Sequence, residues 1–110
     1  MEEFMKCDIV VLPFPFSDLS ASKKRPALVL AVLDHEDHIL CQIISKVKDD
    51  KYSITLEETD FVNGSLKRQS FIRPNRLFTA HRSLILYKVG SIKTEKIKEV
   101  IAAVKSLLEK

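Results

Sequence analysis

The sequence lacks any apolar run near the roughly 20 residues that a membrane-spanning helix requires. Its N-terminus also lacks the charged-then-apolar layout of a secretion signal, because residues 1–4 include two acids. Repeats, low-complexity tracts and linkers are absent too. We therefore expect the 110 residues to form one domain, spanning 1–110, that works in the cytoplasm and away from membranes.

Cysteine is scarce, with only Cys7 and Cys41, and their spacing matches no metal site. Both lie in apolar, strand-like runs, so we expect reduced core residues of a cytosolic protein and no disulfide. His35 and His38 flank two acids in a polar turn, where a metal site is conceivable. The simpler interpretation is that these are solvated turn residues, and we expect neither a metal nor another cofactor.

Acidic residues are missing from one long segment. The net charge of +3 is too small to argue for a nucleic-acid partner by itself. Residues 61–94, however, contain no Asp or Glu, and the seven cations in this segment are Lys67, Arg68, Arg73, Arg76, Arg82, Lys88 and Lys93. Such a segment predicts a locally positive surface that binds a polyanion. The alternative is a solvated face that pairs with acids elsewhere, such as Glu57, Glu58 and Asp60.

Short apolar runs rich in β-branched residues predict a mainly β fold. The expected strands cover 7–13, 25–33, 38–45, 52–57 and 84–89, with a turn at Asn63-Gly64. Two strand pieces at 69–73 and 77–79 flank Pro74-Asn75, where the proline implies a bulge, a bend or a sheet edge. Thr94 is expected to cap a terminal helix with Glu95 in its first turn. The apolar stripe of this helix is expected to pack on the barrel or on a partner subunit. Five or six strands and one helix suggest a small barrel.

Arg25 stands where a cationic loop becomes a buried strand. Lys23 and Lys24 precede it, and Pro26 restricts it to extended geometry. The apolar run 27–33 then has no polar member, as expected of a strand buried on both faces. A fixed guanidinium of this kind suits a phosphate, because its fork is planar and always charged. The alternative is a pair with a surface carboxylate.

Three segments together resemble the MazF/PemK family of toxin endoribonucleases. They are RPALVL at 25–30, QIIS at 42–45 and SFIRPNRLFT at 70–79, and the similarity extends from about Cys7 to the terminal helix. The resemblance implies an SH3-like small barrel (MazF/CcdB-like) that forms a homodimer in a type II toxin–antitoxin system. It also implies metal-independent, sequence-specific cutting of single-stranded RNA and a cognate antitoxin protein that occupies the RNA groove.

The resemblance also assigns catalytic roles. Arg25 matches the family arginine that contacts the scissile phosphate, and Ser45 stands where members carry Thr or Ser. Arg73 falls where some members use an arginine beside an acid, but the acid is replaced here by Asn75. A second family acid is replaced by Ser20, which leaves Asp18 as the nearest loop carboxylate and the general base unidentified.

The remaining candidates are substrate-binding residues around these three. Phe16, with Phe14, either stacks on unpaired bases or covers the barrel as a hydrophobic flap. His81 either contacts a phosphate or base or is a surface histidine. The full substrate-binding set is Phe16, Asp18, Ser20, Lys23, Lys24, Lys46, Asn75, Arg76 and His81.

Two other functions stay open. One is a noncatalytic nucleic-acid-binding barrel, which the missing carboxylates at Ser20 and Asn75 favour. The other is a barrel that poisons a protein target, as the CcdB gyrase inhibitors do. Those inhibitors rely on a tryptophan near the C-terminus, and this sequence has none.

Overall fold

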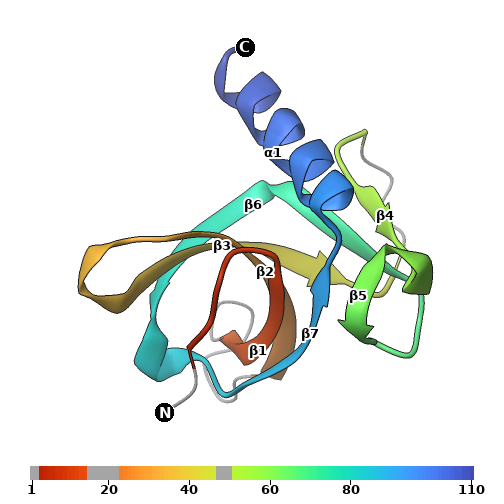
Figure 1. The fold of residues 1–110 in the computed structure, drawn as a ribbon. Coiled ribbons are helices and arrows are strands. Elements are labelled where there is room, and N and C mark those ends of the chain that lie inside the picture. The colour runs from red at the N-terminus through yellow and green to blue at the C-terminus, as the bar shows by residue number, and fades with distance from the viewer. Residues whose placement is uncertain (1–2, 15–22, 47–50) are drawn as a thin grey trace.

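The computed structural model describes residues 3–14, 23–46 and 51–110, which form one antiparallel sheet and a C-terminal helix (Figure 1). Its strands are β1 Asp8–Phe14, β2 Lys23–Val32, β3 Asp37–Ile44, β4 Ile54–Leu56, β5 Phe61–Gly64, β6 Ser70–His81 and β7 Tyr87–Ile92. The helix α1 is Thr94–Leu108, and single 3-10 turns are η1 Asp34–Glu36, η2 Glu58–Asp60 and η3 Arg82–Leu84. The candidates Phe16, Asp18 and Ser20 lie outside the described residues.

The sheet is strongly curled. Its strand order is β4-β6-β3-β2-β1-β7-β5, so the two edge strands, β4 and β5, are neighbours in sequence. Only Glu57 and η2 separate them, and this short link draws the two edges together (Figure 1). The described chain therefore confirms the expected mainly β, barrel-like fold with a terminal helix.

Strand β5 is a correction to the sequence-based prediction, which placed a turn at Asn63-Gly64. Gly64 does have the positive φ of +74° that turn patterns favour, but it pairs with Gly90 of β7. A Cβ at Gly64 would lie 2.0 Å from the Val89 carbonyl oxygen, and one at Gly90 would lie 2.5 Å from the Asn63 carbonyl oxygen. The only two glycines of the sequence therefore permit this close approach of two strands.

Two further boundaries differ from the prediction. The expected pieces 69–73 and 77–79 form the single strand β6, which carries a bulge, one of the irregularities that Pro74 predicts. Arg73 pairs with Gln42, and Leu77 pairs with the adjacent Cys41. The last strand begins at Tyr87 rather than at residue 84, because η3 occupies Arg82–Leu84. A bulge inserts unpaired residues while the strand continues, which accommodates Pro74 without ending β6.

The two faces of the sheet carry separate apolar clusters. The first contains Leu28, Cys41, Ile43 and Ile72 with Ile97 and Val100 of α1, so the helix stripe packs on the sheet. The second cluster comprises Phe4, Val10, Leu12, Phe14, Ala27, Val29, Leu40, Ala80 and Ile85. Helix α1 begins at Thr94 with Lys93 in the N-cap position and no side-chain cap, so the predicted Thr94 cap is wrong, whereas Glu95 lies in the first turn.

Buried polar groups fix the N-terminal segment. The Asp8 carboxylate accepts hydrogen bonds from the Met5 backbone N–H at 2.8 Å and the Ser91 hydroxyl at 2.7 Å. His38 is 3% exposed, with its ring nitrogens 3.1 Å from the carbonyl oxygens of Glu36 and Phe4. The interpretation of His38 as a solvated turn residue is therefore wrong, because β3 carries it into the core.

Both cysteines are free thiols. Cys41 is fully buried, and burial raises its pKa to about 12. Cys7 is half-buried just before β1, where burial also raises its pKa. In the described ranges no helix has the length and apolar character needed to cross a membrane.

Candidate functional site

The register of three adjacent strands places Arg25 and Arg73 on one face of the sheet. Ala27 of β2 pairs with Gln42 of β3, and Gln42 pairs with Arg73 of β6. Paired residues in antiparallel strands point to the same side, and residues two apart in a strand do so as well. Arg25, two residues before Ala27, therefore shares a face with Gln42 and Arg73.

This face continues the second apolar cluster. Arg25 pairs with Leu12, and Ala27 pairs with Val10, both of which are buried members of that cluster. Arg25 and Arg73 are half-buried, so they lie where the apolar face gives way to solvent. A guanidinium in this position is held by its neighbours yet remains accessible to an anion.

The spacing allows both arginines to bind one anion. An interstrand distance of about 4.8 Å and a rise of about 3.3 Å per residue put their Cα atoms roughly 12 Å apart. Two arginine side chains can close that distance around a phosphate placed between them.

Gln42 is a further candidate for this site, one that the sequence alone did not indicate. It is half-buried between the two arginines in the register, and its amide offers both a donor and an acceptor. The sequence does contain one local sign of it, because Gln42 is the single polar residue between Ile39 and Ile44. Without the strand pairing, nothing in the sequence connected it to Arg25.

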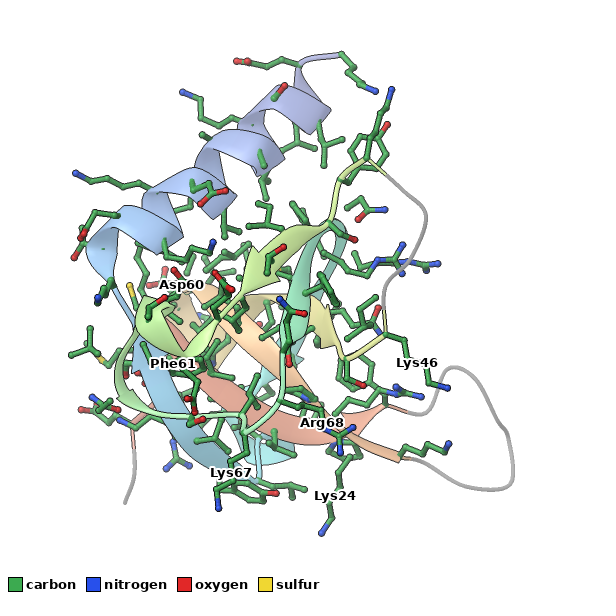
Figure 2. The ribbon with its side chains drawn as sticks, turned by 90° about the vertical axis from the view of Figure 1, so that its right-hand side faces the viewer. Lys24, Lys46, Asp60, Phe61, Lys67 and Arg68 are labelled. Atoms are coloured by element: carbon green, nitrogen blue, oxygen red, sulfur yellow. The ribbon has the colours of Figure 1, made fainter. Side chains whose placement is uncertain are left out.

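Three lysines lie at the same end of the sheet, two at the start of β2 and one shortly after β3. Lys23 and Lys24 begin β2 and are exposed, and continuing the register places them beside the end of β3. Ser45 and Lys46 follow that end and are exposed. Figure 2 shows Lys24 and Lys46 on one side of the molecule, with Arg68 between them in this view. Because Ser45 is one residue past β3, strand alternation does not fix its direction, and its phosphate contact stays a prediction.

The bulge of β6 holds two more of the candidates. Asn75 and Arg76 are exposed and lie among the three residues between Arg73 and Leu77 that have no β3 partner. The regular alternation that would put Asn75 on the face of Arg73 does not run through a bulge. Their roles in substrate binding stay predictions.

His81 is placed apart from the others. It pairs with Asp37 at the start of β3, whereas Arg25 is level with the end of that strand, roughly 23 Å away along its length. Its ring accepts a hydrogen bond from the Ser83 backbone N–H at 3.1 Å and so caps η3. The structure therefore does not bring His81 together with the other candidates.

Metal ligands do not cluster in the parts of the chain that the structure describes. Within residues 3–14, 23–46 and 51–110, no group of three or more His, Cys, Asp or Glu side chains could hold an ion. The end of the sheet around Arg25, Gln42 and Arg73 instead offers guanidinium, ammonium and amide donors. Such donors bind and polarise phosphate groups.

A curled antiparallel sheet, a terminal helix and cations gathered at one sheet end define a small basic barrel domain. Residues 5–108 match the family model described as the PemK-like, MazF-like toxin of type II toxin-antitoxin systems. The chain belongs to this family. No curated protein sequence is a significant match.

Solved structures show the same fold at low sequence identity. A MazE-MazF structure from Deinococcus radiodurans is 21% identical, with a TM-score of 0.78, and the match covers 99% of this chain and 98% of that one. A MazF structure from the same organism is 20% identical, with a TM-score of 0.77 over 100% of both chains. An endoribonuclease in complex with its cognate antitoxin, from a mycobacterial species, is 8% identical, with a TM-score of 0.75 over 97% and 96%.

Proposed function

We propose that this protein is an endoribonuclease toxin that cuts single-stranded RNA at specific sequences without a metal ion. It acts in the cytoplasm as a homodimer, and a cognate antitoxin neutralises it. The observation that carries the proposal is the placement of Arg25 and Arg73 on one face of the sheet, with Gln42 between them. Membership of the PemK/MazF toxin family supports it.

Cleavage would use the RNA's own 2′-hydroxyl as nucleophile. That oxygen loses its proton to a general base and bonds to phosphorus, and the bond from phosphorus to the 5′-oxygen breaks. The leaving oxygen takes a proton, so the products are a 2′,3′-cyclic phosphate and a 5′-hydroxyl. The phosphorane between them carries extra negative charge, which Arg25 and Arg73 would stabilise at roughly 3 kcal/mol for each well-placed donor.

Ser45 and the lysines complete the proposed site. The Ser45 hydroxyl would donate to the scissile phosphate, and Arg25 would also donate one of its own protons to the leaving oxygen and recover it from water. Lys23, Lys24, Lys46 and Arg76 would hold neighbouring phosphates as point charges or forks. The general base is unidentified, because Ser20 and Asn75 replace the two acids of the family pattern. Asp18 is the carboxylate nearest to Ser20 in the loop sequence.

The antitoxin would compete for the same cations. One structural relative is an endoribonuclease in complex with its cognate antitoxin, and another is a MazE-MazF structure. We propose that an antitoxin segment of this chain's own partner lies across the Arg25–Arg73 face and blocks access for RNA. Such a segment needs carboxylates, because the described face presents cations and an amide.

The test is RNA cleavage by the purified protein in excess chelator. We expect cleavage to persist, and we expect an RNA with deoxyribose at the cut position to bind yet stay intact. Loss of cleavage in chelator would contradict the metal-independent mechanism, and cutting of the deoxyribose substrate would rule out attack by the 2′-hydroxyl.

Two alternative functions predict different results, one in the cleavage assay and one in a supercoiling assay. The replacement of a family acid by Asn75 favours a noncatalytic nucleic-acid-binding barrel, which would bind RNA without cutting it in any condition. A CcdB-like toxin would instead inhibit gyrase in a supercoiling assay. We expect no gyrase inhibition, because the sequence lacks the tryptophan on which those inhibitors rely.

A further inference from the structure

A depression with mixed charge lies beside the proposed RNA-cutting face. It has a volume of about 330 Å³ and is lined by Glu57, Glu58, Lys67, Arg68 and Gln69. One wall is the turn from β4 into η2, and the other is the segment between β5 and β6. Figure 2 shows Lys67 and Arg68 on this side of the molecule.

The two walls are tied together by Ser65. Its hydroxyl donates to Oε1 of Glu58 at 2.7 Å and accepts from the Lys67 backbone N–H at 2.9 Å. The Ser70 hydroxyl holds the Arg68 carbonyl at 3.2 Å. The segment that carries Lys67 and Arg68 is therefore fixed relative to Glu58 before any ligand arrives, which reduces the entropy lost on binding.

Opposite charges face this depression without pairing. The Glu57 carboxylate is used in the capping box of η2, where it accepts from the Asp60 backbone N–H. Glu58 forms no ion pair with Lys67 or Arg68 among the described residues. The lining of the depression therefore includes a carboxylate, a guanidinium that forms no ion pair with it, and the Gln69 amide.

The depression lies within reach of RNA bound at the cutting face. Gln69 immediately precedes β6 and is four residues before Arg73, a distance of roughly 13 Å along an extended chain. Continuing the β3–β6 register also places Gln69 level with Lys46. A single strand that crosses the Arg25–Arg73 face would reach this depression within a few nucleotides.

We infer that this depression is a base-recognition subsite for an unpaired guanine that flanks the cut; the inference rests on the proposed ribonuclease function. Guanine presents two adjacent donors, N1–H and N2–H, which suit the Glu58 carboxylate. Its O6 and N7 acceptors suit the Arg68 fork or Lys67. Adenine, cytosine and uracil lack that pair of adjacent donors, so the carboxylate discriminates against them.

The test compares guanine with inosine, which lacks the N2 amino group, in otherwise identical RNAs. The ends of a random-sequence RNA pool are mapped first, and we expect guanine to be enriched at one fixed position near the cut. At that position, inosine should lower kcat/KM for the wild-type protein roughly tenfold, as expected when a bidentate base interaction is reduced to one hydrogen bond. The same RNAs with deoxyribose at the cut give dissociation constants by fluorescence anisotropy, so the preference is readable without cleavage.

Glu58→Gln is the decisive variant, because its amide oxygen can still accept from Ser65. We expect guanine and inosine to become equivalent for Glu58→Gln, whereas Glu99→Gln on the exposed side of α1 keeps the wild-type preference. Equal use of guanine and inosine by the wild type, enrichment of another base, or a preference that survives in Glu58→Gln would overturn the subsite. Cleavage with no guanine dependence would leave the ribonuclease proposal intact, whereas guanine-dependent binding without cleavage would remove the nuclease and keep the subsite.

Discussion

Gln42 in β3 is the direct cross-strand partner of Arg73 in β6. Since Gln42 also pairs with Ala27 of β2, the same row of the sheet leads to Arg25 two residues earlier. Two consecutive strands, β2 and β3, and the distant strand β6 thus contribute an amide and two guanidinium groups to one face. The proposed chemistry depends on this register, because a slip of one residue in any strand would move its polar group to the opposite face.

Replacing Arg73 with alanine should reduce cleavage roughly a hundredfold, because a second fixed cation near the phosphorane is removed. Arg73→Lys should fall between alanine and wild type, since it keeps the charge but not the planar fork. The measurement is kcat/KM on one RNA, with circular dichroism to show that each variant folds. Equal activity of Arg73→Ala and wild type would remove Arg73 from the site.

Replacing Lys23 and Lys24 together with alanine should weaken RNA binding and make it less sensitive to salt. Removing one lysine–phosphate interaction with a single strand lowers the log–log slope of affinity against salt by about 0.7, so removing two lowers it by about 1.4. Binding of a deoxyribose-blocked RNA at several salt concentrations measures the slope. The matched control is Lys98→Ala with Lys105→Ala, two exposed lysines of α1; an equal slope change there would argue for net charge alone.

The Asp8 carboxylate should be a major source of stability for the N-terminal segment. Asp8→Ala leaves the Met5 backbone N–H and the Ser91 hydroxyl without their acceptor, which should lower the free energy of unfolding by about 2–3 kcal/mol. Ser91→Ala removes only one of these bonds and should cost about 1 kcal/mol. Urea unfolding measures the loss of stability in each variant. Equal losses in Asp8→Ala and Ser91→Ala would show that the hydrogen bond from the Met5 backbone N–H contributes nothing.

Cys41 should make stability fall at alkaline pH. Burial raises the pKa of its thiol from 9.0 to about 12 in the folded protein, so the unfolded chain loses this proton first. The contribution of the buried thiol to the free energy of unfolding is therefore complete below about pH 9. It decreases by about 1.4 kcal/mol per pH unit as the pH rises toward 12. Urea unfolding of wild type and Cys41→Ala at pH 8 and about pH 10 measures this contribution as a difference in the free energy of unfolding. A difference that does not change with pH would contradict the burial of this thiol.

The sequence predicted the strongly patterned elements best. Residues 27–30 of the apolar run after Pro26 are the buried part of β2, whereas Val32 and Leu33, expected to be buried as well, are exposed. The three-and-four spacing after Thr94 is the helix that packs on the sheet. Strand β5 was missed because it is short and at the sheet edge, and because its Gly64 has a turn-like φ. The close pairing of Gly64 with Gly90 is a tertiary contact, which local pattern cannot reveal.

The site was only partly predictable for the same reason. Arg25 is marked locally, by the cations before it and the buried strand after it. Gln42 becomes a candidate only when the β2–β3–β6 register puts it between two arginines, and the depression at Glu58 and Arg68 requires η2 to meet the segment before β6. His81 shows the reverse case, because its basic neighbourhood in sequence suggested a site from which the fold separates it.

The role proposed for Arg25 is tested most sharply by mapping the ends of RNA treated with wild type and with Arg25→Ala in excess chelator. We predict 2′,3′-cyclic phosphate and 5′-hydroxyl ends from the wild type and from Lys98→Ala. Arg25→Ala should fold normally and cut at least roughly a hundredfold more slowly. Wild-type products with 5′-phosphate ends, or equal cutting by Arg25→Ala, would contradict this mechanism.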